Sequence, residues 1–96
     1  MNKYQVTVYF TIEGDFMSHI PTHRAYINAL IIKNVIDQYA ISAERGMGWI
    51  TMNARTKKEV IKHLEKSPLY GYFKIEIDDL MVFDGKAMRF PAMVLN

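Results

Sequence analysis

The fold of this chain is decided by the stretch Ser67-Pro68-Leu69-Tyr70-Gly71-Tyr72-Phe73-Lys74-Ile75-Glu76-Ile77-Asp78-Asp79-Leu80. Ser67-Pro68 predicts the end of a helix, because a residue that precedes proline disfavours the helical backbone conformation. A short aromatic loop follows. From Phe73 onward apolar and charged residues alternate, which indicates a strand with one buried face. We expect this strand to extend to about Phe83 and to close a small sheet.

The N-terminal segment shows the same strand pattern, followed by a helix. Apolar and polar residues alternate from Lys3 to Ile12. Ser18 is the favoured cap of the helix, because Pro21 then falls in the first turn, where its missing N–H costs nothing. Asp15 is the alternative cap, and Asn34 is the expected C-terminal stop. The residues at helical spacing are Ile20, Arg24, Ile27, Leu30 and Ile31.

The middle of the chain predicts a hairpin and a second helix. Residues 35–42 and 47–53 have strand patterns, and the short turn between them makes the two strands antiparallel neighbours. Thr56 followed by Glu59 forms a capping box that opens a helix. The inner face of that helix is expected to contain Val60, Ile61 and Leu64.

The predicted order is strand, helix, strand, strand, helix, strand, over one domain of residues 1–96. For this order the ferredoxin-like α+β sandwich, with four antiparallel strands and both helices on one face, is the simplest solution. The other face would leave residues such as Tyr9 exposed, and a patch of that kind usually marks an interface. Two sheets packed face to face form a dimeric α+β barrel. After a turn at Asp84-Gly85, Met88 to Leu95 is an apolar extension that fits a further strand.

Composition excludes several classes of protein. The 96 residues have a net charge of +2 and contain no cysteine, which rules out disulfide scaffolds, thiolate zinc sites and cysteine nucleophiles. No leader-like segment opens the chain, and the apolar run from Ala29 to Ile32 is far too short to cross a membrane. We therefore expect a cytoplasmic protein without a membrane partner.

Metal and nucleic-acid sites are not expected. His19 and His23 lie four residues apart on a helix, but no third ligand completes a metal site. The helix after Thr56 has lysines at every fourth position. No aromatic residues or RNA-binding signature accompany them, so a solvated helix face is the better interpretation.

The chain resembles the muconolactone isomerase family. The match is most specific from Met52 to Leu80, where the stretch quoted above is similar to the family's Leu-Pro-Leu-Phe-Pro-Tyr-Met-Asp-Ile-Glu-Val-Asp-Gly-Leu. The resemblance implies a ferredoxin-like fold, homodimers or larger rings, no cofactor, and movement of a proton within an unsaturated lactone. A weaker resemblance, to YCII-type domains, rests on His23 and Tyr26 and implies that the histidine lines a cleft.

His23, Arg24 and Glu76 are the candidates for chemistry. A histidine moves protons near neutral pH, and an arginine holds a carboxylate through two hydrogen bonds. The alternative for His23 and Arg24 is a surface pair, or an Arg24 stem packed over the sheet edge. Glu76 lies on the predicted last strand and is the second candidate for proton transfer. Its alternative role is on the polar side of an edge strand.

Five more residues are candidates for substrate binding. Arg45 and Trp49 flank the predicted hairpin, where they could hold and stack on an anionic planar ligand. The alternatives are a solvated arginine and a tryptophan buried in a dimer interface. Tyr39, Ser42 and Tyr72 could supply hydroxyl groups to a cleft between sheet and helix. Tyr72 has a second interpretation, as a packing residue that anchors its loop.

Together these observations favour a cofactor-free isomerase or lyase-type enzyme that acts on a small acidic or aromatic-derived metabolite. The alternative is a non-catalytic domain for ligand binding or assembly. The enzyme hypothesis requires His23, an arginine and a hydroxyl group to converge on one pocket.

Overall fold

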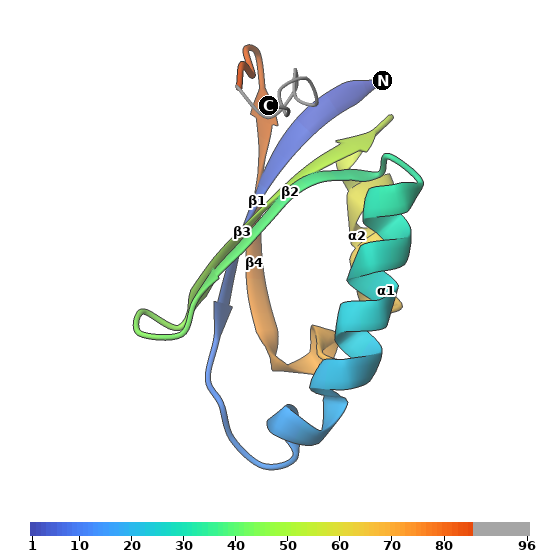
Figure 1. Cartoon of the computed structure of the whole chain (residues 1–96). Helices are drawn as coiled ribbons and strands as arrows, with labels where there is room; N and C mark the ends of the chain where they lie inside the picture. Colours follow the sequence, from blue (N-terminus) through green and yellow to red (C-terminus); the bar gives the residue numbers. More distant parts are fainter. Residues whose placement is uncertain (86–96) are drawn as a thin grey trace, which may run out of the picture.

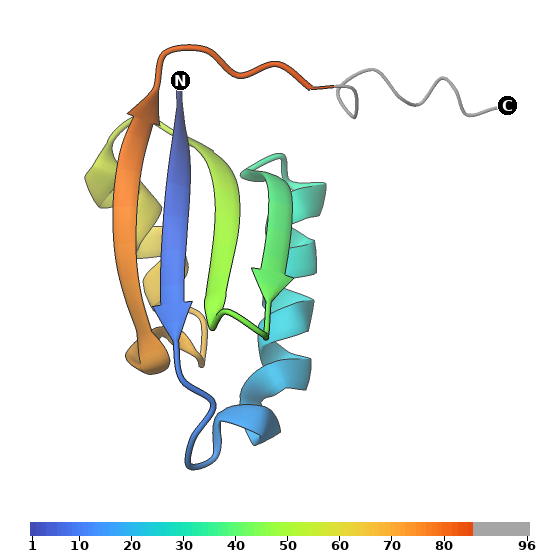
Figure 2. The same cartoon turned by 90° about the vertical axis from the view of Figure 1, so that its left-hand side faces the viewer.

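The computed structural model describes residues 1–85, in which one antiparallel sheet carries two helices on one face (Figure 1). The strand order is β2-β3-β1-β4, as Figure 2 shows face on. This is the predicted ferredoxin-like α+β arrangement, and the predicted fold class is confirmed. The elements are β1 (Asn2–Phe10), η1 (Phe16–His19), α1 (Ile20–Ile32), β2 (Ile36–Ser42), β3 (Met47–Ala54), α2 (Lys57–Glu65), η2 (Tyr70–Tyr72) and β4 (Phe73–Leu80).

Strand pairing assigns each side chain to one of two faces. Val6 of β1 lies opposite Ile50 of β3 and Ile77 of β4, and these three side chains point toward the helices. The neighbouring residues along each strand point the other way, because side chains alternate across a strand. Within residues 1–85 no helix covers that second face, which we call the open face (Figures 1 and 2).

The hydrophobic core lies between the inner face of the sheet and the two helices. Fully burying an aliphatic side chain stabilises a fold by roughly 1.5–3 kcal/mol. Side chains from both helices, including Ile27 and Leu30 of α1, and from three of the strands therefore carry much of the stability. The largest fully buried side chains are Val6, Val8, Ile36, Ile50, Met52, Val60 and Leu64.

The start of α1 differs from the prediction. The helix begins at Ile20, and a short 3₁₀ turn, η1, precedes it. Ser18 is not the cap, because it lies inside this turn and its hydroxyl donates to the Asp15 carbonyl oxygen at 2.7 Å. Pro21 does lie in the first turn, as predicted.

The buried face of α1 is also rotated from the predicted one. It contains His23, Ile27 and Leu30, whereas Ile31 is 40% exposed and Arg24 faces solvent. Apolar spacing alone assigned the face wrongly because the first inward residue is a histidine.

The ends of both helices form largely as predicted. Asn34 adopts a left-handed φ of +63° after α1, and the Val35 N–H then donates to the Leu30 carbonyl at 2.9 Å. Thr56 caps α2 by accepting from the Glu59 N–H at 3.1 Å. The Glu59 carboxylate returns to the N–H of Arg55 rather than to the cap residue itself.

The last strand is shorter than predicted. It ends at Leu80, which pairs with Lys3, because its partner strand β1 begins only one residue earlier, at Asn2. Asp84 and Gly85, where the sequence predicts a turn, are the last two residues that the structure describes. The predicted extension from Met88 to Leu95 lies outside the described residues. Neither helix in residues 1–85 has the length and apolar character needed to traverse a bilayer.

Candidate functional site

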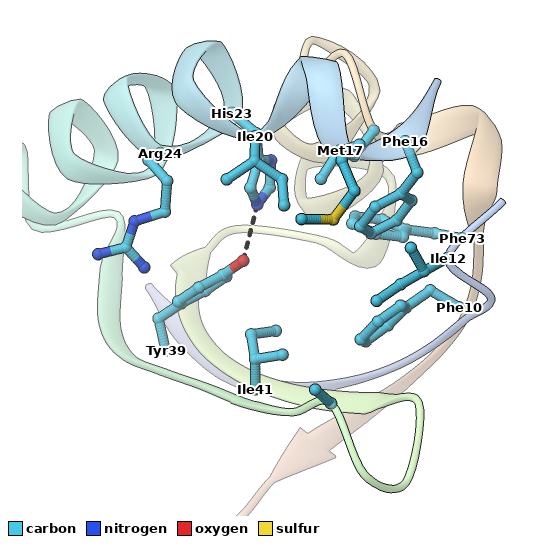
Figure 3. A pocket seen from close by; sticks show the side chains of 12 residues that line it. Phe10, Ile12, Phe16, Met17, Ile20, His23, Arg24, Tyr39, Ile41 and Phe73 are labelled. Carbon is cyan, nitrogen blue, oxygen red and sulfur yellow. Dashed lines mark hydrogen bonds between the residues drawn. The ribbon is translucent and has the colours of Figure 1, made fainter. Parts of the chain in front are cut away.

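A cavity of about 320 Å³ lies between the N-terminal part of α1, strand β2 and the start of β4 (Figure 3). Its walls are mostly apolar. Three polar side chains interrupt them, and these are His23, Arg24 and Tyr39. A largely apolar cavity with a few convergent polar groups is the usual form of a small-molecule site.

Three phenylalanines form one wall of the cavity. Phe10 and Phe73 are direct neighbours in the pairing of β1 with β4, and their ring centroids lie 6.5 Å apart. The turn η1 brings Phe16 onto Phe10, where the rings stack at 5.5 Å. In Figure 3 this wall lies across the cavity from Arg24 and Tyr39.

His23 connects the cavity to the protein interior. It is only 3% exposed, and its Nε2 lies 2.7 Å from the Tyr39 hydroxyl (Figure 3). Its Nδ1 lies 2.6 Å from Ser67 Oγ, which also accepts a hydrogen bond from the Leu69 N–H at 3.0 Å. The fold therefore joins residues from α1, from β2 and from the turn after α2 in one hydrogen-bonded chain.

A bulge in β2 determines that Tyr39 faces this cavity. Ile36 pairs with Met52 on the inner face, but the next paired residue, Gln38, lies on the open face. Asp37 is the extra residue, and one inserted residue reverses the face of every residue that follows. Without the bulge, Tyr39 would point to the opposite side of the sheet from His23.

The buried site favours neutral side chains. Burial lowers the pKa of His23, and the nearby positive charge of Arg24 lowers it further. Burial raises the pKa of Tyr39, although Arg24 opposes that change. At neutral pH the imidazole is therefore uncharged and the phenol keeps its proton.

Arg24 supplies the positive charge of the site. It follows His23 directly in α1, and its side chain extends beside Tyr39 (Figure 3). Among the lining residues in the described part of the chain, it alone carries a permanent charge. It is therefore placed to hold an anionic oxygen of a ligand that contacts Tyr39.

The cavity also has exposed apolar side chains around it. Ile12, Met17 and Ile41 all line it, and they are 50%, 60% and 45% exposed. Gly48 makes room for Ile41, because an added Cβ would lie 2.4 Å from the Ile41 Cδ1 atom. A ligand with an apolar body would cover these side chains.

Glu76 and Trp49 lie on the open face, away from this cavity. Both are neighbours of Thr7, which pairs with Trp49 on β3 and with Glu76 on β4. Glu76 accepts a hydrogen bond from the Tyr9 hydroxyl at 3.0 Å. The structure therefore does not bring Glu76 together with His23, because alternation along the strands puts the sheet between them.

Ser42, Arg45 and Tyr72 also do not line the cavity. Ser42 Oγ accepts from the Arg45 N–H at 3.3 Å inside the β2–β3 hairpin, and the Arg45 side chain is exposed. The Tyr72 hydroxyl donates to the Asp15 carboxylate, and this bond raises the pKa of Tyr72. This bond links η2, which contains Tyr72, to the residue just before η1.

Sequence reasoning missed Ser67 and the phenylalanine wall. The local sequence marks Ser67 only as the end of a helix, and Ser67 lies 44 residues from its partner His23. A signal for the wall was present, because Phe10 and Phe73 end and begin paired strands. Residues 1–85 contain no group of three side chains that could hold a metal ion.

No protein-family model and no curated protein matches this sequence. The crystal structure of muconolactone isomerase matches with a TM-score of 0.68 at 12% identity, over 86% of this chain and 92% of that chain. A second match is the 5-chloro-2-hydroxyhydroquinone dehydrochlorinase of Burkholderia phenoliruptrix AC1100 in complex with 2,5-dihydroxybenzoquinone. Its TM-score is 0.54 at 16% identity, over 88% of this chain and 97% of that chain. This chain therefore has a muconolactone isomerase-like fold.

Proposed function

We propose that this chain is a cofactor-independent enzyme of the isomerase or lyase type, which transfers a proton in a small oxygenated ring compound. The observation that carries the proposal is the buried hydrogen-bonded chain from Ser67 through His23 to Tyr39 at the cavity. Burying polar groups is costly unless each finds a partner, and an apolar residue in place of His23 would suit the core better. The buried histidine beside Arg24 therefore supports a role in chemistry rather than in packing.

Each polar residue has a role in this proposal. The hydroxyl of Tyr39 is the acid–base group that meets the substrate, and the neutral imidazole of His23 is its hydrogen-bond partner. General acid–base groups contribute roughly 10²–10⁴-fold to a rate. Arg24 holds a carboxylate or enolate oxygen of the substrate. The phenylalanine wall packs against the flat face of a ring.

The size and lining of the cavity support a ring compound as substrate. A volume of about 320 Å³ suits a small substituted ring. The two enzymes of similar fold are named for a lactone and for a hydroxylated, chlorinated hydroquinone. A small acidic or aromatic-derived metabolite is therefore the proposed substrate class.

Binding and proton exchange test the proposal separately. Calorimetry with 2,5-dihydroxybenzoquinone should detect binding to the wild type, with weaker binding to Arg24→Met. Arg45→Met is the matched control, because Arg45 is an exposed arginine outside the cavity. Binding that is unchanged in Arg24→Met, or equally weakened in both variants, would contradict the proposed site.

Catalysis is tested by deuterium incorporation into muconolactone in D₂O, followed by NMR. The wild type should exchange a ring proton, and Tyr39→Phe should slow the exchange by about 10²-fold or more. Tyr9→Phe is the control, since it also removes one hydroxyl but lies on the open face. Binding without any exchange would instead favour the non-catalytic ligand-binding alternative.

Self-association is part of the proposal. Tyr9, Met47 and Trp49 are partly exposed on the open face, and a second sheet packed against them would bury them. Sedimentation should show a dimer or larger ring for the wild type and a smaller species for Trp49→Lys. Thr22→Lys, on the exposed side of α1, is the control and should leave the assembly unchanged. A monomeric wild type would contradict this part.

A further inference from the structure

The hydrogen bonds around Ser67 restrict where its proton lies. A backbone N–H can only donate, so Ser67 Oγ accepts from Leu69 at 3.0 Å. Within residues 1–85, the other partner of Ser67 Oγ is His23 Nδ1, at 2.6 Å. Ser67 is 6% exposed, so water is a poor substitute partner. The Ser67 hydroxyl is satisfied as a donor only if it donates to Nδ1.

This arrangement determines the tautomer of His23. An uncharged imidazole has one N–H and one acceptor nitrogen. If Nδ1 accepts from Ser67, the proton of the ring lies on Nε2 and is donated to the Tyr39 oxygen, 2.7 Å away. Burial of His23 favours the uncharged ring that this reasoning requires. The opposite tautomer would leave a buried serine hydroxyl without an acceptor.

The tautomer in turn directs the Tyr39 hydroxyl. Its oxygen accepts from His23, so its own proton cannot be donated back to the ring. Tyr39 lines the cavity beside Arg24 (Figure 3). The O–H group is therefore free to donate a hydrogen bond to a ligand, and the charge of Arg24 would stabilise negative charge on the oxygen that accepts this bond.

We propose that Ser67 is a positioning residue that holds His23 in the Nε2–H tautomer, so that the Tyr39 hydroxyl donates a hydrogen bond to a carbonyl or enolate oxygen of the ligand. The ligand part of this inference rests on the proposed function, because it needs the cavity to be a binding site. The tautomer part is a property of the free protein. The proposal narrows the substrate class to ring compounds that present an acceptor oxygen at this point.

The tautomer is measured by long-range ¹H–¹⁵N NMR on the full chain, labelled at histidine, without ligand. The wild type should show one Nε2–H tautomer for His23. Ser67→Ala should show a mixture, because Nδ1 loses its donor and Tyr39 becomes free to donate to Nε2. Ser67→Thr keeps the hydroxyl and should restore the single tautomer. An Nδ1–H tautomer in the wild type, or no change in Ser67→Ala, would overturn the proposal.

Ligand selectivity is measured with 1-indanone and 1-indanol. The two compounds share a ring skeleton, but the first carries a carbonyl group where the second carries a hydroxyl group. The wild type should favour the ketone. Because an unmatched buried polar group weakens binding, the preference should fall by about fivefold or more in Ser67→Ala and return in Ser67→Thr. Preference for the alcohol in the wild type would overturn the inference. If neither compound binds, both the proposed binding site and the ligand part of this inference are refuted. The NMR result still decides the tautomer part.

Discussion

Removal of the Ser67 hydroxyl should cost more stability than its small size suggests. The Oγ atom has two partners, His23 Nδ1 at 2.6 Å and the Leu69 N–H at 3.0 Å. Both partner residues are 3% exposed, so water cannot readily replace the hydroxyl. Each buried group left without a partner costs about 1–3 kcal/mol, so loss of both partners in Ser67→Ala should lower the free energy of unfolding by about 2–6 kcal/mol.

Urea unfolding followed by circular dichroism measures this change, with comparable m-values as the condition for comparing variants. Ser18→Ala is the matched control. Ser18→Ala also removes one serine hydroxyl, but Ser18 is exposed and its hydroxyl donates to a single carbonyl oxygen. A loss within about 0.5 kcal/mol is expected there, as for most surface changes. If Ser67→Ala costs no more than Ser18→Ala, the buried hydrogen-bonded chain does not exist as described.

Three further predictions concern pH and local backbone structure. Burial lowers the folded pKa of His23 below its unfolded value of about 6.5, so its stabilising contribution is complete above that pH and is lost as the pH falls from there through the folded pKa. Urea unfolding measures the free energy of unfolding at about pH 7.5 and about pH 5. Between these two pH values it should fall less in His23→Gln than in the wild type, and an equal fall in both would refute this. Gly46→Ala should cost about 1–3 kcal/mol in the same assay, because φ is +63° and a Cβ would lie 2.8 Å from the Phe10 carbonyl oxygen; a neutral effect would argue against this turn. Thr56→Ala should cost about 1 kcal/mol through loss of the bond from the Glu59 N–H, whereas Thr56→Ser should keep most of it.

Local features of this protein are readable in its sequence because their causes are local. Alternation of side chains identifies β1 and β4, since successive residues of a strand face opposite sides. Thr56 and Asn34 mark helix ends because capping hydrogen bonds join residues only a few positions apart. From the number and order of such elements, the ferredoxin-like arrangement follows with few alternatives.

The composition of the site depends on contacts that no local pattern contains. The single extra residue Asp37 turns Tyr39 toward His23, and helical spacing had placed Arg24 rather than His23 on the inner face of α1. Glu76 is the second candidate for proton transfer in the sequence, but pairing of β4 with β1 decides which face of the sheet it occupies.

Sequence by itself therefore determined the main helices and strands, their order and the set of candidate residues for proton transfer. Only the tertiary structure decided which of them meet. Ser67 and Tyr39 lie 44 and 16 residues from His23, and the fold alone brings all three within hydrogen-bond distance. The physical reason is that strand register and helix rotation are set by packing of the whole core, whereas propensity and capping act over a single turn.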